Sequence, residues 1–390
     1  INYYICKNIY MKITNFKSGN FVQRFQYQSF EPKKIDLQWH IDNDEIGLLL
    51  SQTDLKLGEL NAFSQLIPDV DFFIKMHIFK EGTKSNQIEG TQTNIDEAVQ
   101  KEEYISAEKK DDWHEVQNYI LAMNEAIAQL SKLPLSNRIL KNTHKILLQG
   151  VRGKHKLPGE FRISQNWIGG NSLAEAKFIP PHQDGLLDYM ADLENFIHSQ
   201  NSNLPHLIKI AIIHYQFETI HPFLDGNGRV GRLLITLYLV STGLLSKPVL
   251  YLSDYFEKNR RQYYDYLTEV RTKNNLIQWL KFFLEGTRIT AESSIQTFKA
   301  MLILKKELEI KIIKLGKKQL LAKKLLEFLY GNPITDMNSI AIALKVSPST
   351  VSRLLYDFIN LEILIELTGF KRNRKFVFED YMKLFRDKIN

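Results

Sequence analysis

Cysteine is nearly absent from this sequence: its 390 residues include one, Cys6. A lone cysteine excludes an intramolecular disulfide and a cysteine-ligated zinc site, and it favours a reducing compartment. Long apolar runs are also lacking, because the longest, 233–245, contains Thr236 and Gly243 and is shorter than the roughly 20 residues of a membrane-spanning helix. The first residues show no clean apolar core followed by a small-residue cleavage site, so we expect no export signal. We expect a cytoplasmic protein without a membrane partner.

A strong excess of either charge is lacking as well, with 51 Lys and Arg against 44 Asp and Glu and a net charge of +7. Residues 315–390 hold 13 of the basic and 8 of the acidic residues, so they carry +5 of this total. Hydrophobic residues make up 44% of the chain, as in an ordinary soluble globular protein. The length allows two or three folded units, and the basic excess lies in the last of them.

Apolar spacing and glycine and proline content divide the chain into successive regions. Spacings of three and four between apolar residues, as at Leu57 and Leu60, indicate helices over most of the chain. The sequence starts with Ile1, and the first methionine is Met11. Residues 1–10 can therefore be an artefact of where the gene was taken to start, and we assign no function to them. We expect an amino-terminal extension, an amino-terminal helical region, a core, and a linker helix with a small carboxy-terminal domain, at residues 1–44, 45–150, 151–300 and 301–390.

Glycine and proline are concentrated in residues 151–183, where they are too dense for helix interiors. Two short strand-like pieces, 167–168 and 178–179, flank a glycine-containing turn. The region therefore predicts a loop with a β-hairpin that presents an exposed strand edge. Such an edge is able to bind an extended partner segment through backbone hydrogen bonds.

The end of the chain shows a different pattern. Residues 337–361 read as helix, short turn and helix, and strand-like pieces at 363–365 and 376–378 bracket a basic loop. This order predicts a helix-turn-helix followed by a basic hairpin wing, the arrangement of a winged-helix domain. Such domains bind DNA or dock on proteins, so both partners remain open. The residues expected to contact DNA are Arg353, Lys371, Arg372, Arg374 and Lys375.

The most informative segment is 220–232, IHPFLDGNGRVGR, which lies between two apolar helical patterns. Gly226 and Gly228 let backbone amides approach a ligand, and a helix that begins there points its free N–H groups at the same place. Arg229 and Arg232 lie on the first turns of that helix, where guanidinium groups bind phosphate. The letters also match a dinucleotide fingerprint, but that motif must follow a buried strand. The segment therefore predicts a phosphate-binding site.

Two further side chains in this segment carry chemistry. His221 is the candidate general base, since a neutral imidazole beside bound phosphate can take a proton from an attacking hydroxyl. The simpler alternative is a histidine that fills a helix end. Asp225 offers the hard oxygen ligand that suits Mg²⁺ bridging phosphates.

The sequence HPFLDGNGRVGR resembles the signature of the Fic family, H-P-F-x-D/E-G-N-G-R-x-x-R, with every fixed position present. The likeness covers residues 45–290, where Gly159–Arg162 and 168–181 resemble the entry segment and target-docking flap of the family. Tyr263 and Tyr264 resemble its adenine-side aromatic pair. The resemblance implies a mainly α fold, with a Fic-type helical core, a β-hairpin flap and a small carboxy-terminal winged-helix domain of α+β class.

The resemblance also implies an activity, the transfer of AMP from ATP to a Ser, Thr or Tyr hydroxyl of a protein, the enzyme itself included. Mg²⁺ would accompany the ATP. His221 would deprotonate the target and Asp225 would hold the metal ion. The phosphates would be bound by Gly226, Asn227, Gly228, Arg229 and Arg232.

A second motif, Ser85-Asn86-Gln87-Ile88-Glu89-Gly90, matches the inhibitory pattern S/T-x-x-x-E-G/N of the same family. Ser85 and Glu89 lie four residues apart on one helix face, so the hydroxyl would hold the carboxylate where it pairs with Arg232. The alternative is a solvated glutamate before a glycine cap. After Gly90, Thr93 and Asp96 predict a capping box and a new helix.

Three functions therefore remain open. The first is an adenylyltransferase autoinhibited by Glu89. The second is a DNA-binding regulator whose Fic core senses nucleotide or is vestigial. The third is a de-AMPylating phosphodiesterase in which Glu89 orients water. The complete motif favours the first, although the same residues serve AMP transfer and AMP removal.

Overall fold

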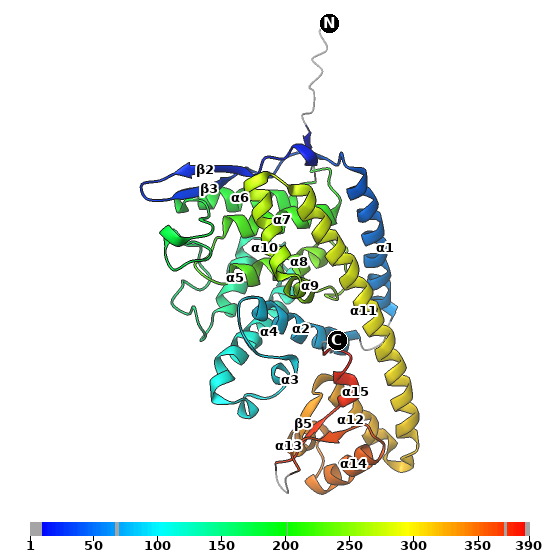
Figure 1. Ribbon diagram of the computed structural model, residues 1–390. Helices are drawn as coiled ribbons and strands as arrows, with labels where there is room; N and C mark the ends of the chain where they lie inside the picture. Colours follow the sequence, from blue (N-terminus) through cyan, green and yellow to red (C-terminus); the bar gives the residue numbers. More distant parts are fainter. Residues whose placement is uncertain (1–9, 67–69, 201, 370–372, 387–390) are drawn as a thin grey trace.

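The computed structural model describes residues 10–66, 70–200, 202–369 and 373–386. A large helical unit lies above a smaller unit formed by the end of the chain (Figure 1). The mainly helical fold is the one that the sequence predicts. Within the described ranges, every helix is too short or too polar to span a bilayer.

The centre of the large unit is α7, in which every residue from Leu207 to Ile220 is buried. A helix whose apolar residues lie on every side is expected inside the core, and in α7 the polar side chains among them, such as Gln216 and Glu218, are buried too. It packs against α8, which is buried along most of its length. The helices are α1 (Asp44–Leu66), α2 (Val70–Ile88), α3 (Ile95–Ala98), α4 (Lys110–Leu130), α5 (Asn137–Leu147), α6 (Leu186–His198), α7 (His206–Ile220), α8 (Asn227–Ser241), α9 (Ser253–Lys258), α10 (Arg260–Lys273) and α11 (Leu276–Ile313).

The amino-terminal extension folds onto this unit. Strand β1 (Met11–Lys12) pairs in parallel with β4 (Trp39–His40), and β2 (Gly19–Gln23) forms an antiparallel hairpin with β3 (Gln28–Pro32). The Phe30 N–H donates to the carbonyl of Ile179 over 2.9 Å, so β3 lies beside the region predicted as a flap.

Short 3₁₀ helices occur along the described chain: η1 (Ile13–Asn15), η2 (Glu102–Tyr104), η3 (Ala107–Lys109), η4 (Leu173–Glu175), η5 (Gln183–Gly185) and η6 (Gly316–Lys318).

The predicted hairpin at 168–181 is reduced to one antiparallel bridge, Ile168 to Phe178. Gly169 and Gly170, with φ of +71° and +74°, turn the chain immediately after the bridge, and η4 fills the loop. The tight turn therefore ends the pairing early. One end of this segment is already bonded to β3, so the expectation of a free edge does not hold at Ile179.

Helix α3 begins one residue later than the sequence analysis expected. The capping box is formed by Asn94 and Glu97: the Glu97 N–H donates to Asn94 Oδ1 over 2.9 Å, and the Asn94 N–H donates to Glu97 Oε2 over 3.0 Å. The Thr93 carbonyl instead accepts a hydrogen bond from the side chain of Gln87, on α2. The prediction of Thr93 and Asp96 as the box was wrong because Asn94 takes the capping position.

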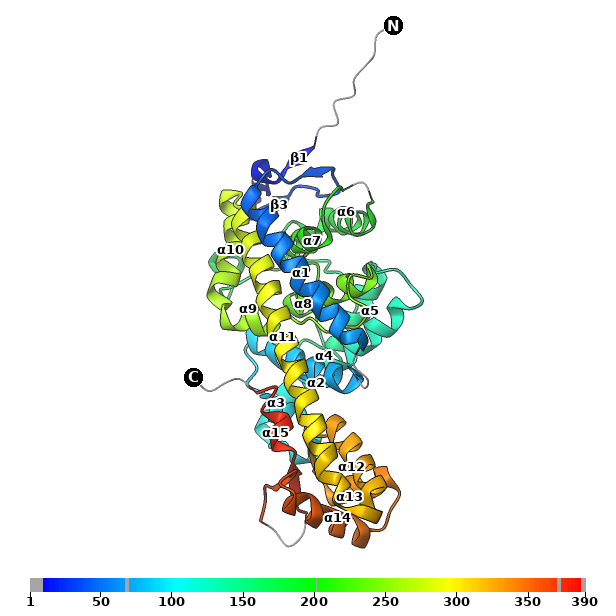
Figure 2. The same ribbon diagram turned by 90° about the vertical axis from the view of Figure 1, so that its right-hand side faces the viewer.

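Helix α11 has 38 residues and continues through the boundary predicted at residue 300. In Figure 2 it runs alongside α1 and on into the small unit.

In the small unit, α13 and α14 are joined by a turn in which Lys345 is in the left-handed region and Ser347 caps α14. An antiparallel sheet of order β5-β7-β6 adjoins them. The elements are α12 (Gln319–Gly331), β5 (Ile334–Asp336), α13 (Met337–Leu344), α14 (Pro348–Asn360), β6 (Ile365–Glu366), β7 (Lys375–Val377) and α15 (Glu379–Met382). Their order follows the expectation, and membership of the winged-helix class stays a prediction.

Candidate active site

The loop between α7 and α8 is built from its own sequence. Helix α7 ends because His221 adopts the left-handed conformation with φ +51°, and Gly226 does the same at the start of α8 with φ +76°. The Asn227 amide closes the loop, since Oδ1 accepts from the Phe223 N–H and Nδ2 donates to the Phe223 carbonyl, each over 2.8 Å. The Asn227 side chain therefore fixes the shape of the loop, and one N–H of its Nδ2 is already used for this purpose.

His221 is held through its backbone. Its carbonyl accepts hydrogen bonds from Arg162 Nε over 3.0 Å and from Asn166 Nδ2 over 3.1 Å. Burial of the ring, together with the positive charges of Arg271 and Arg162, lowers the pKa of His221 to about 3. The imidazole is therefore neutral near pH 7 and has a nitrogen lone pair that is able to accept a proton.

Asp225 lies at the mouth of the loop. Its Oδ1 atom accepts the Gly226 N–H over 2.6 Å and lies 3.6 Å from Arg229 Nη2, and its side chain is 42% exposed. No group of three or more His, Cys, Asp or Glu able to hold a metal ion occurs among the described residues. Mg²⁺ often binds through one or two carboxylates while substrate phosphates complete its shell. Asp225 fits an ion that arrives with a triphosphate.

His144, on α5, fixes the backbone at Asp225. Its Nδ1 accepts the N–H of Gly159, so Nε2 must carry the proton that is donated to the Asp225 carbonyl over 3.0 Å. The ring stacks on Phe223 with centroids 3.8 Å apart. Burial lowers the pKa of His144 to about 4, which keeps this tautomer neutral. A neutral histidine therefore connects two loops of the site.

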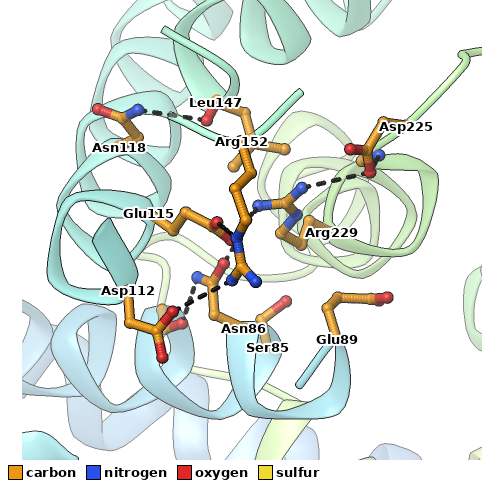
Figure 3. A network of polar contacts seen from close by, with 12 residues as sticks. Ser85, Asn86, Glu89, Asp112, Glu115, Asn118, Leu147, Arg152, Asp225 and Arg229 are labelled. Carbon is orange, nitrogen blue, oxygen red and sulfur yellow. Dashed lines mark hydrogen bonds and ion pairs between the residues drawn. The ribbon is translucent and has the colours of Figure 1, made fainter. Parts of the chain in front are cut away.

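Arg229 is oriented by α2 and α4 (Figure 3). Its Nη1 atom donates to Glu115 Oε2 over 3.0 Å and to Asn86 Oδ1 over 3.4 Å, and the arginine and Glu115 are both buried. The other oxygen of Glu115 accepts from Arg152 Nε over 2.7 Å. Arg152 Nη2 also donates to Asp112 Oδ1 over 3.1 Å, so both guanidinium groups are held in a network with carboxylates, and the shared Glu115 fixes Arg229 beside the start of α8.

Arg232 is held by the predicted inhibitory motif. Its Nε donates to Ser85 Oγ and its Nη2 to the Ser85 carbonyl, both over 2.9 Å, and Nη2 also donates to Glu89 Oε1 over 2.6 Å. Ser85 thus orients the arginine, where the sequence analysis expected it to hold the carboxylate. A Cβ at Gly228 would lie 2.4 Å from Glu89 Oε1. Only glycine lets the Glu89 carboxylate rest on the first turn of α8.

The electrostatics of Glu89 fit this position. Burial alone would raise the pKa of its carboxyl, but the charge and hydrogen bond of Arg232 outweigh burial and lower it. Glu89 is therefore an anion at neutral pH, placed at a helix amino terminus and beside two arginines. Phosphate groups favour the same environment.

The tyrosine pair separates into two environments. Tyr263 is fully buried, stacks on Phe256 with centroids 4.5 Å apart, and donates its hydroxyl proton to His214 Nε2 over 2.9 Å. The ring of Tyr263 therefore has no exposed surface for adenine, and its adenine-side role stays a prediction. Tyr264 is 40% exposed and remains available to a ligand.

Several residues that orient the site were not assigned a role from the sequence: Asn86, Glu115, His144, Arg162 and Asn166. Asn86 lay inside the quoted inhibitory motif and Arg162 inside the quoted entry segment, so position in a motif was an available signal for these two. Glu115 lies on an amphipathic helix like any solvated glutamate, and it shows no local signal.

The basic residues of the small unit differ in exposure and in whether other side chains of this chain already contact them. Arg353 is exposed on α14, whereas Arg374 is paired with Glu366 across the hairpin. The Lys375 ammonium group lies 3.8 Å from the centre of the Tyr104 ring. Lys371 and Arg372 lie outside the described residues.

Comparison with known proteins agrees with these features. The sequence profile described as Fic/DOC family N-terminal matches residues 48–128, and the profile of the Fic/DOC family matches residues 134–239. A curated protein of Aedes aegypti named Protein adenylyltransferase Fic is 34% identical over 135 residues, which are 34% of this chain and 24% of that protein. A Drosophila grimshawi protein of the same name is 29% identical over 190 residues, or 48% of this chain and 36% of that protein. The match thus spans about a quarter to a third of these relatives.

Solved structures share the fold. A Fic family protein from Desulfovibrio desulfuricans G20 superposes with a TM-score of 0.55 at 20% identity, over 87% of this chain and 97% of its own. A Fic domain containing signaling protein from Bacteroides thetaiotaomicron VPI-5482 gives a TM-score of 0.52 at 19% identity, over 64% and 97% of the two chains. At this identity the likeness concerns the fold alone.

Proposed function

We propose that the chain is a protein adenylyltransferase of the Fic/DOC family, because residues 48–128 and 134–239 match the profiles of that family. It would transfer AMP from ATP to a side-chain hydroxyl of a protein, itself included. One observation carries the proposal: a neutral His221 stands beside a helix amino terminus that already binds an anion, the carboxylate of Glu89. A triphosphate would take the place of that carboxylate.

The reaction that fits this geometry is an in-line displacement. His221 takes the proton of the target hydroxyl as its oxygen attacks the α-phosphorus, and the bond to pyrophosphate breaks as the new P–O bond forms. The α8 backbone with Arg229 and Arg232 offsets the charge of the phosphate oxygens. The protein forms no covalent bond with the substrate in this step, so positioning and electrostatics supply most of the acceleration.

The metal proposal concerns Asp225. Mg²⁺, when bound, supplies Lewis-acid neutralisation of the phosphates, and the Asp225 carboxylate would hold it there. Asp225→Asn should raise the Mg²⁺ concentration needed for half-maximal AMP transfer by about tenfold or more, because one charged ligand is lost. The measurement is a magnesium titration at fixed ATP, with the exposed Asp188→Asn as a matched control. Superimposable titrations for wild type and Asp225→Asn would remove the metal role.

The activity itself is tested with ATP labelled at either end. Wild type and Glu89→Gly are incubated with Mg²⁺, a cell lysate and ATP labelled on the α- or the γ-phosphate. AMP transfer predicts that the enzyme adds protein labelling, above that of the lysate alone, from the α-label and adds none from the γ-label. Labelling from γ instead would indicate phosphorylation, and no labelling from either by Glu89→Gly would contradict the proposal.

A second candidate function, DNA binding, concerns the small unit. It is favoured by the exposed Arg353 on α14 and weakened by the internal partners of Arg374 and Lys375. We expect duplex DNA to be retarded by the full chain at low salt, with an affinity that falls steeply as salt rises.

Removing one phosphate contact should flatten the slope of log affinity against log salt by about one unit. The salt slope is measured for Arg353→Ala. The control is Arg374→Ala, because the Arg374 side chain is already paired with Glu366. A full chain that retards no duplex at low salt would leave protein docking as the role of this unit.

A further inference from the structure

The helix that ends at the inhibitory motif also carries the contact with the small unit. Phe72 and Phe73, at the beginning of α2, face Tyr330 and Phe385 of the small unit, with ring centroids 5.6 and 6.3 Å apart. The Tyr381 hydroxyl donates to the Phe72 carbonyl over 3.4 Å. From Phe73 to its last residue α2 is about 22 Å long, at 1.5 Å rise per residue. One helix thus joins the small unit to the Glu89 end of α2.

The chain is held by the small unit again after Glu89. Arg386 forms a two-pronged ion pair with Asp96 on α3, with N–O distances of 2.7 and 3.0 Å. Lys101 and the Tyr104 hydroxyl both donate to Asp336 Oδ2, over 3.0 and 3.1 Å. Figure 1 and Figure 2 both place α2 and α3 between the large and small units.

We propose that the small unit is a clamp on the inhibitory segment, so that docking of residues 319–369 and 373–386 on α2 and α3 holds Glu89 over the first turn of α8. This inference rests on the proposed function, and it assigns a regulatory role to an interface inside the chain. Aromatic contacts fix one flank of Glu89 and ion pairs fix the other. Release of the small unit therefore loosens the Glu89 carboxylate, while the α7–α8 loop keeps its own hydrogen bonds.

The polar flank is the part to change, because Asp96, Lys101 and Arg386 are partly exposed and substitutions there are compatible with folding, whereas the buried Asp336 is left unchanged. Asp96→Arg places two positive charges together, and Lys101→Glu places a second carboxylate beside Asp336. The restoring variant adds Arg386→Asp to Asp96→Arg, which recreates the ion pair with its signs exchanged. It also carries Glu379→Gln, because the Glu379 carboxylate, which accepts from Arg386 Nη1 over 2.6 Å, would otherwise repel the new aspartate. The matched control is Asp188→Arg, an exposed residue in the first turn of α6.

Two readouts are compared in the full chain. Hydrogen exchange reports on the amides of Glu89, Gly90 and Thr91, which are bonded to carbonyls of α2. AMP incorporation from α-labelled ATP reports on activity. Asp96→Arg with Lys101→Glu should speed exchange in this segment and raise AMP incorporation by about two- to fivefold, a modest factor because partly exposed ion pairs are weak. In a Glu89→Gly background the same changes should have no effect on activity.

Faster exchange and higher activity in Asp96→Arg and in the double variant are the expected results. The effect of Asp96→Arg alone should be reversed by the restoring variant, and Asp188→Arg should show no effect. Unchanged exchange overturns the clamp. Faster exchange without higher activity, in a protein whose Glu89→Gly form is active, also overturns it. If Glu89→Gly is inactive, the proposed function fails, and hydrogen exchange alone then decides whether the small unit holds the segment.

Discussion

Replacing His221 with alanine should lower the rate of AMP transfer by about 10² to 10⁴, the usual contribution of a general base. The site explains why the loss should be confined to the chemical step. The His221 backbone, and not its ring, receives the hydrogen bonds of Arg162 and Asn166. The phosphate-binding helix and its arginines are held by other elements, so ATP affinity should change less than about threefold.

The measurement is AMP incorporation in the Glu89→Gly background, together with nucleotide affinity by calorimetry. His155→Ala, which changes an exposed histidine of a neighbouring loop, is the matched control and should keep the full rate. Transfer at an undiminished rate by His221→Ala would rule out this residue as the base. A loss of ATP affinity equal to the loss of rate would instead indicate a binding role.

Replacing Glu89 with glycine should raise AMP incorporation by at least tenfold. The Glu89 carboxylate is bonded to Arg232 over 2.6 Å and lies against Gly228, where a phosphate group is expected. A charge-assisted pair of about 1.5 to 3 kcal/mol corresponds to roughly one to two decades in population. ATP is able to bind the resting enzyme only by displacing the carboxylate or by misplacing its own phosphates.

Three further variants distinguish the brake from a general loosening. Glu89→Gln keeps the size and removes the charge, so it should activate nearly as well as Glu89→Gly. Ser85→Ala should activate less, because the Ser85 carbonyl still accepts from Arg232. Arg232→Ala should be inactive with or without Glu89, since the arginine is also needed by the transition state. Equal incorporation by wild type and Glu89→Gly would remove the brake and leave the anion site intact.

Local features of this chain were predictable from sequence. The α7–α8 loop follows from His221, Gly226 and Asn227, because each conformation or hydrogen bond there involves residues within a few positions of one another. The pairing of Glu89 with Arg232 was also anticipated, although their contact spans 143 positions. That prediction came from resemblance to a family and not from the physics of the sequence.

Features that depend on tertiary packing were not predictable. The adjacent Tyr263 and Tyr264 look alike in sequence, and only the position of Phe256 and His214 decides that one is buried. Glu115 orients Arg229 from 114 positions away, with no signal in its own neighbourhood. The contacts of α2 with the end of the chain connect segments whose patterns, read separately, show only two ordinary helices.

The bond from Phe30 to Ile179 has a consequence for the design of shorter fragments. The family match begins at residue 48, which makes that position an attractive start for expression. Such a fragment would lack β3, whose Phe30 ring also lies 5.9 Å from Phe178. It would expose a backbone edge and an aromatic ring, and exposed edges promote self-association. A fragment that begins before Gly19 retains β2 and β3, of which β3 covers Ile179 and Phe178. It is therefore the better choice for crystallisation and for binding assays.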